Sequence, residues 1–189
     1  MQTAVDAVTP FGTHVYSDEQ QCIATAGSCI IAYSMQPPDA KYFASWHSIF
    51  SRVVAQQPGK LSILVVIDSG SRSPDESQRK LIASATQRYA QSIERFAYVV
   101  EGRGFAAAAL RSAISLISLA TRTPYRQKVF ASVEEAGVWL AQTAGGTASG
   151  MDVRALSALV HTMRDKVSRL APAPARGHAA PSIQPPVSR

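Results

Sequence analysis

The segment Leu61–Ile67, with the sequence Leu-Ser-Ile-Leu-Val-Val-Ile, constrains the fold more than any other part of the chain. It is almost continuously apolar and rich in β-branched side chains, which is typical of a central strand buried on both faces of a sheet. Helical patterns alternate with strand patterns on either side of it, and that alternation indicates helices covering a sheet. The segment therefore predicts an α/β domain.

The residues before this strand predict a hairpin and a helix. Two short apolar runs flank the turn Ala26-Gly27, which is the pattern of a β-hairpin. After a pair of prolines, Asp39 can cap a helix. The apolar residues of that helix recur at helical spacing: Tyr42, Phe43, Trp46, Ile49, Phe50 and Val53. Residues 1–19 are expected to form an irregular N-terminal segment.

The residues after the strand predict two more strands and three helices. The first helix is expected from Pro74 to Ile93, with Ser73 as its N-cap and Glu76 completing a capping box. The next elements are a strand Phe96–Val100, a well-buried Ala-rich helix Phe105–Leu119, a strand Gln127–Ala131 and a helix capped by Ser132. The fold class expected for residues 20–142 is a mixed, largely parallel sheet of about five strands covered by helices.

The C-terminal part predicts an amphipathic helix in residues 151–170, after a flexible Gly/Ser-rich linker in residues 143–150. Its apolar residues follow gaps of three and four, as in a heptad seam: Val153, Leu156, Val160, Met163, Val167 and Leu170. Such a short helix must bury this seam to be stable. Docking on its own domain, pairing with a second copy and binding another protein are the alternatives. Residues 171–189 are rich in Pro and Ala, and are expected to be disordered.

Charge and cysteine content narrow the class of protein further. The net charge is +6, but most of the excess lies after residue 150, so the main domain does not have the charge of a nucleic-acid binder. No apolar run reaches the roughly 18 residues of a membrane span. The N-terminus does not read as a secretory signal. Cys22 and Cys29 lie among apolar residues and are expected to be buried free thiols, which suits a cytoplasmic protein.

Several segments together resemble a known family. They are Leu61–Asp68, Arg79-Lys80, Phe96–Val100, Gly104-Phe105, Arg111 and the closing block Lys128–Leu140, of which the closing block is the most specific. In these segments, residues 20–142 resemble the STAS domains (sulphate transporter and anti-sigma antagonist), which have the fold of anti-anti-sigma factors. The similarity is closest to uncharacterised bacterial STAS-like proteins. The resemblance implies a non-catalytic regulatory or scaffolding module that binds another protein in bacterial signalling.

In anti-anti-sigma factors, a serine near the start of the helix after the central strand is phosphorylated and switches partner binding. The matching loop here offers Ser69, Ser71 and Ser73. Those factors carry Asp-Ser-(Ser/Thr)-Gly, whereas Asp68-Ser69-Gly70 lacks the second hydroxyl residue. The alternative is that these serines only shape the loop, because Ser and Gly are common turn residues.

The turn Gly102–Ala107 matches the Gly-x-Gly-x-x-Ala pattern of dinucleotide sites, so Gly102 and Gly104 are a possible anion-binding turn. However, the next strand ends in Ser132 rather than the acid that would bind a ribose, which favours a simple tight turn. No histidines have metal-ligand spacing. We therefore expect no enzyme activity, catalytic residue, cofactor or metal. The alternatives are a carrier of a small apolar ligand or lipid with a CRAL-TRIO-like shape and, less favoured, a nucleotide-binding enzyme.

Overall fold

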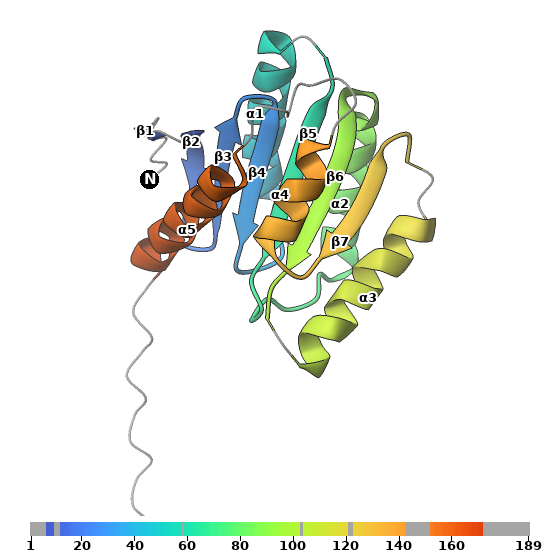
Figure 1. Cartoon of the computed structure of the whole chain (residues 1–189). Coiled ribbons are helices and arrows are strands. Elements are labelled where there is room, and N and C mark those ends of the chain that lie inside the picture. The colour runs from blue at the N-terminus through green and yellow to red at the C-terminus, as the bar shows by residue number, and fades with distance from the viewer. Residues whose placement is uncertain are drawn as a thin grey trace, which may run out of the picture.

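The computed structural model describes residues 7–9, 12–57, 59–102, 104–120, 123–142 and 152–171. Its strands form one mixed sheet in which the spatial order β1-β2-β3-β4-β5-β6-β7 follows the chain (Figure 1). Strands β1 to β4 pair antiparallel, and β4 to β7 pair parallel. The strands are β1 Ala7–Thr9, β2 Gly12–Ser17, β3 Gln21–Ala26, β4 Cys29–Ser34, β5 Leu61–Ile67, β6 Ile93–Val100 and β7 Arg126–Phe130. The mixed α/β class expected from the sequence is confirmed.

The sheet extends further at its N-terminal edge than the sequence indicated. The described part of residues 1–19 is not irregular, because it contains β1 and β2. Strand β2 pairs with β3 over the register Thr13↔Thr25 to Ser17↔Cys22, and Tyr16 is buried. Strand β2 pairs with β3, and β1 pairs with β2, so their hydrogen bonds depend on neighbouring strands that a local pattern does not show. The sheet therefore has seven strands rather than about five.

Helices cover both faces of the sheet (Figure 1). Helices α1 Ala40–Gln56 and α2 Glu76–Arg88 pack on one face, and α4 Val133–Ala141 and α5 Val153–Leu170 pack on the other. Strand β5 contributes to both cores, since Leu61 and Ile63 face α1 and α2 whereas Leu64 and Val66 face α4 and α5. That double burial explains its nearly continuous apolar sequence.

Helix α2 begins and ends at other residues than expected. Its N-cap is Asp75 rather than Ser73, because the Asp75 carboxylate accepts the Gln78 N–H at 2.9 Å and the Gln78 side chain completes the capping box. The helix ends at Arg88, a 3₁₀ turn Ala90–Ser92 follows, and Ile93 already belongs to β6. The apolar spacing of four residues continues to Ile93, so periodicity alone does not reveal where the helix stops.

Helix α3 Phe105–Ala120 lies beside β7 at the edge of the sheet (Figure 1). The expectation that it is well buried is wrong. Of its described side chains, only that of Ala107 is buried, and 90% of the Phe105 side chain is exposed. An apolar composition with little charge suggested burial, but the helix contacts the sheet chiefly through its edge strand, which leaves much of its surface open.

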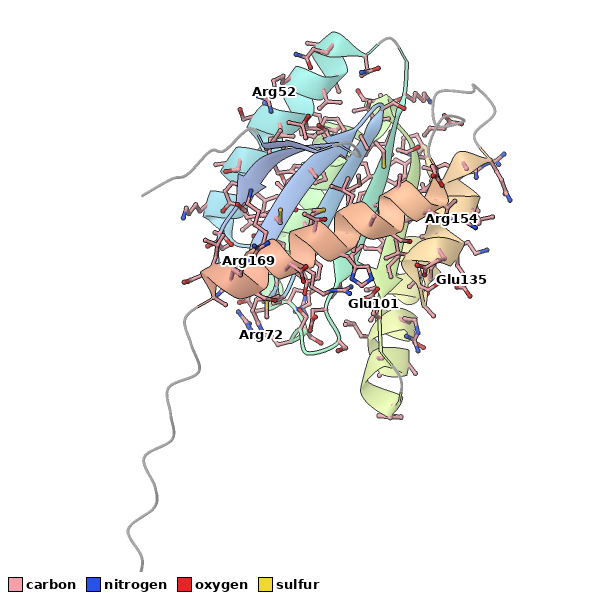
Figure 2. The ribbon with its side chains drawn as sticks, turned by 60° about the vertical axis from the view of Figure 1, so that its left-hand side comes forward. Arg52, Arg72, Glu101, Glu135, Arg154 and Arg169 are labelled. Atoms are coloured by element: carbon pink, nitrogen blue, oxygen red, sulfur yellow. The ribbon has the colours of Figure 1, made fainter. Side chains whose placement is uncertain are left out.

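Helix α5 crosses the sheet and docks on its own domain (Figure 2). Four seam residues are buried against the sheet, together with Leu159: Leu156, Val160, Met163 and Val167. Where α5 meets α4, a side chain at Gly137 would lie 3.1 Å from Leu156 and 3.2 Å from Val153, so the small residue permits close packing. Leu170 remains 47% exposed.

Of the three alternatives for the seam, docking on its own domain is therefore the one that the structure shows. Docking on the sheet buries the apolar stripe within the chain, which leaves no seam free for a partner. The predicted linker in residues 143–150 and the predicted disordered residues 172–189 lie outside the described residues. None of the described helices is both long enough and apolar enough to cross a bilayer.

Candidate functional site

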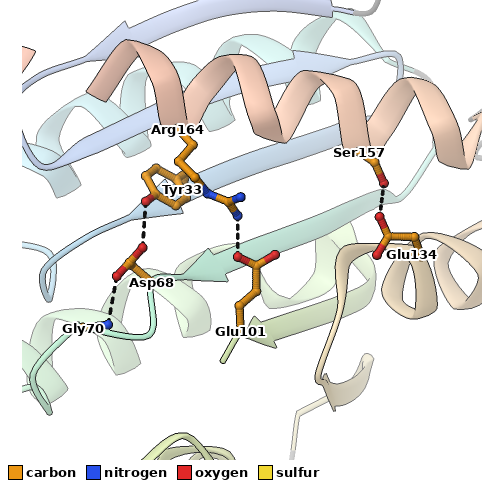
Figure 3. A network of polar contacts seen from close by, with 7 residues as sticks. All are labelled: Tyr33, Asp68, Gly70, Glu101, Glu134, Ser157 and Arg164. Atoms are coloured by element: carbon orange, nitrogen blue, oxygen red, sulfur yellow. Dashed lines mark hydrogen bonds and ion pairs between the residues drawn. The ribbon is translucent and has the colours of Figure 1, made fainter. Parts of the chain in front are cut away.

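Polar side chains gather where β4, β5 and β6 end (Figure 3). Asp68 directly follows β5, and Glu101 directly follows β6. The two strands are parallel, with Ile67 paired to Val100, so both carboxylates lie at the same edge of the sheet. This carboxyl edge is where ligands and partners of open α/β sheets commonly bind.

Asp68 organises the beginning of the loop after β5. Its carboxylate accepts the Tyr33 hydroxyl at 3.0 Å and the Gly70 N–H at 2.8 Å. Its backbone N–H donates to the Ser34 carbonyl at 2.9 Å, and its carbonyl accepts the Ser71 N–H at 3.0 Å. Burial, together with the neighbouring Asp68, raises the pKa of Tyr33 to about 12. Tyr33 therefore remains a protonated donor at neutral pH.

Arg164 of α5 ties that helix to the same edge. Its guanidinium forms an ion pair with Glu101 and lies 5.6 Å from the centre of the Tyr33 ring. About 30% of each side chain of the ion pair is exposed, so the pair is partly shielded from water. This polar network links four side chains to one another and holds α5 against the carboxyl edge of the sheet. Its members are Tyr33, Asp68, Glu101 and Arg164.

The turn after β6 packs against the loop after β5. Gly102 and Gly104 have φ values of 98° and 93°, which glycine adopts without strain. Arg111 of α3 donates to the Val100 carbonyl at 2.8 Å and holds the beginning of the turn. A Cβ atom at Gly102 would lie only 2.8 Å from the Ser69 Cβ, whereas a Cβ at Gly104 would meet nothing within 4 Å. Ser69 therefore occupies the space beside Gly102 that a pyrophosphate would need in a dinucleotide site.

The three candidate serines differ in their surroundings. Ser69 and Ser73 are exposed, whereas Ser71 is half-buried and its hydroxyl donates to the Arg72 carbonyl at 3.4 Å. None of them caps α2, because Asp75 takes that position. Ser69 contacts Gly102 and therefore lies near the beginning of α3 rather than that of α2.

Sequence reasoning missed the residues that build this edge. It assigned Phe105 to a buried helix, although this is the most exposed large apolar side chain described. It gave no role to Tyr33, Glu101 or Arg164. One available signal was that Asp68 and Glu101 each occupy the first position after an apolar strand, where parallel strands bring side chains together.

Both cysteine side chains lie in the interior of the protein. Cys22 and Cys29 are fully buried, and burial raises the pKa of each thiol to about 12. No three His, Cys, Asp or Glu side chains of the described residues lie close enough together to share a metal ion. Comparison with protein-family models and with curated proteins finds none that matches the chain.

Proposed function

We propose that the chain is a non-catalytic, STAS-like regulatory or scaffolding module that binds a partner protein in bacterial signalling. The partner binds at the docking edge, which we define as the exposed residues Ser69, Arg72, Ser73, Gly104 and Phe105. The observation that carries the proposal is the 90% exposure of Phe105 at the first position of α3. Exposed aromatic side chains that fill a pocket of the partner supply much of the energy of protein interfaces.

The order of elements supports the family resemblance behind this proposal. A β3–β4 hairpin is followed by a strictly alternating series of helices and parallel strands that ends in α4. This is the order of elements that the STAS resemblance implies for residues 20–142. The fold alone does not define a function, so the docking edge carries the specific claim.

The docking edge is rigid enough to bind without a large loss of entropy. Asp68 holds the loop that carries Ser69 through two side-chain and two backbone hydrogen bonds. Arg111 holds the turn that leads to Phe105. Preorganised surfaces lose less conformational freedom on association, which favours affinity.

A non-catalytic role is supported by how the polar groups at this edge are used. The carboxylates of Asp68 and Glu101 accept bonds from Tyr33 and Arg164, respectively. These bonds hold each carboxylate to a neighbouring strand or helix. The polar network connects β4, β5, β6 and α5, which is a structural task.

Phosphorylation of Ser69 is the regulatory step that fits this surface best. A phosphate adds about −1.5 to −2 charges at neutral pH. Because Ser69 touches Gly102, this charge would lie beside the turn that leads to Phe105. It would change the charge and the shape of the docking edge.

We place the module in the cytoplasm, where the thiols of Cys22 and Cys29 remain reduced.

The alternative of an apolar-ligand or lipid carrier receives less support. A cavity among the described residues is lined by four charged side chains: Lys60, Glu94, Arg95 and Arg126. Pockets for apolar ligands are lined predominantly by hydrophobic and aromatic side chains. The cavity therefore suits a charged ligand better than a lipid.

Affinity purification of the full chain from its native cell tests the proposal. We expect Phe105→Asp to abolish recovery of the partner, because a charge in the apolar contact cannot be accommodated. The matched control is Val138→Asp on α4, where another exposed apolar side chain, 52% exposed, lies outside the docking edge. The purified partner should then bind the chain and the Val138→Asp variant, but not the Phe105→Asp variant. Equal binding by all three proteins would refute the proposal, as would the absence of any partner.

A further inference from the structure

The opposite edge of the sheet, at the amino ends of β5, β6 and β7, contains a cavity of about 420 Å³. This volume lies within the range of small-molecule sites in proteins. Three cations line the cavity, Lys60, Arg95 and Arg126, against one acid, Glu94. Pro124 and Tyr125 provide an apolar and an aromatic part of the wall. The lining therefore carries a net positive charge.

Arg95 gives this cavity a buried cation without a matching anion. Only 5% of the residue is exposed. Its guanidinium donates to the Trp139 and Gln142 carbonyls at the end of α4, the latter at 2.7 Å, and lies 4.9 Å from the Trp139 ring centre. Within the described residues, its Nε finds no hydrogen-bond acceptor, and no carboxylate lies within ion-pair distance of the guanidinium.

The electrostatic consequence favours an anion in the cavity. The end of a helix carries about half a negative charge, so the carbonyls of α4 offset the charge of Arg95 only in part. A buried charge that lacks a full counter-charge is costly, and an anion nearby would reduce that cost. Arg126 lies directly opposite Arg95 in the β6–β7 register and is exposed, so a second guanidinium is available at the same place.

We propose that this cavity binds a phosphate monoester. Several cations around one cavity suit a dianion, and arginine presents a planar fork that pairs two phosphate oxygens. Arg126 and Lys60 would contact the phosphate, and Arg95 would add a fixed positive potential. Tyr125 and Pro124 would contact the organic group of the ester. This site is separate from the docking edge and does not rest on partner binding there.

Calorimetric titration of the full chain with phenyl phosphate tests this site, since the probe carries one phosphate and one aromatic ring. We expect saturable binding at one site, weakened about tenfold by Arg126→Gln and by Lys60→Gln, as for the loss of a charge-assisted hydrogen bond. The matched control is Arg169→Gln, which removes one exposed charge from the last turn of α5, a helix that packs on strands β2, β3 and β4 rather than at the amino ends of β5 to β7.

Two outcomes would overturn the inference. One is the absence of saturable binding below about 10 mM phenyl phosphate. The other is equal weakening by Arg126→Gln and Arg169→Gln, since this would show a general effect of net charge. Recovery of the partner protein by the Arg126→Gln variant is measured in parallel. It should be unchanged, so failure of the anion site and failure of the docking edge give different results.

Discussion

At the scale of single residues, two glycines of the same turn have similar backbone conformations but different surroundings. Gly102 and Gly104 both have positive φ values, 98° and 93°. Only Gly102 has a neighbour where its side chain would be, since the Ser69 Cβ lies 2.8 Å from that position. The contact joins the loop after β5 to the turn after β6, so Gly102 is the residue on which the shape of the docking edge depends.

We expect Gly102→Ala to destabilise the protein more than Gly104→Ala. In both variants, the positive φ at the new alanine lowers the free energy of unfolding by about 1–2 kcal/mol. At Gly102, the clash with Ser69 adds about 1–3 kcal/mol, typical of overpacking. Urea unfolding of both variants measures the difference. Equal free energies of unfolding would show that the two loops do not pack closely in solution.

The contributions of single residues could be predicted from the sequence only in part. Asp39 and Ser132 were identified as helix caps, because an N-cap side chain acts on a backbone N–H only three residues away. Arg164 was not identified, because its partner Glu101 is distant in sequence and meets it only after α5 has docked. Local interactions are thus visible in a sequence, whereas contacts between distant segments are not.

At the scale of elements, α5 completes the core on one face of the sheet. Its apolar side chains pack against strands β2, β3 and β4 and against α4. The heptad pattern indicated that the helix must bury a stripe, but the same pattern also suits pairing with a second helix. The apolar face of the sheet that α5 covers decides between these partners. That face is built from other segments of the chain, so the sequence of the helix alone does not reveal it.

We expect Leu159→Ala to lower the free energy of unfolding by about 2–5 kcal/mol, because it leaves a cavity between α5 and the sheet. Leu159 is 1% exposed. The control Leu170→Ala, at a side chain that is 47% exposed, should change stability by less than about 0.5 kcal/mol. Denaturant unfolding compares them. Equal small effects would show that α5 does not dock on the sheet in solution.

A hydrogen bond between α4 and α5 should make their contact depend on pH. The Ser157 hydroxyl donates to Glu134 at 2.8 Å, and this bond lowers the pKa of Glu134. A carboxyl group with a lowered pKa in the folded state stabilises the fold above its unfolded pKa, and this contribution is lost as pH falls through the folded pKa.

We therefore expect Ser157→Ala to cost up to about 1 kcal/mol at pH 7, and the cost to be smaller at an acidic pH below the lowered pKa of Glu134. Ser168→Ala, at an exposed serine of the same helix, corrects for the higher helix propensity of alanine. Urea unfolding at both pH values gives the difference between the two variants. A difference that persists unchanged in acid would contradict the assigned bond.

The elements that the sequence predicted best are those with a strong local pattern. Strand β5 has the bounds expected, and the apolar face of α1 consists of the residues named for it. Strand β2 was missed because its stability comes from pairing with β3, and the end of α2 was missed because apolar spacing continues into β6. Both errors arise where a neighbouring element, and not the local sequence, determines the structure.

At the scale of the whole molecule, the two ends of the parallel strands have different properties. The carboxyl edge presents Phe105 and Ser69 above an internally satisfied polar network. The amino edge has an open cavity with a net positive lining. The proposed docking edge and the proposed anion site therefore lie at opposite ends of the parallel strands and do not overlap.

Hydrogen exchange of the chain alone and in complex with its partner shows whether that partner binds at the docking edge. Amides buried by an interface exchange more slowly. We expect increased protection in residues 68–74 and 104–108, with exchange in residues 124–130 at the amino edge unchanged. Protection confined to α5 or to the amino edge, with residues 68–74 and 104–108 unaffected, would contradict this prediction.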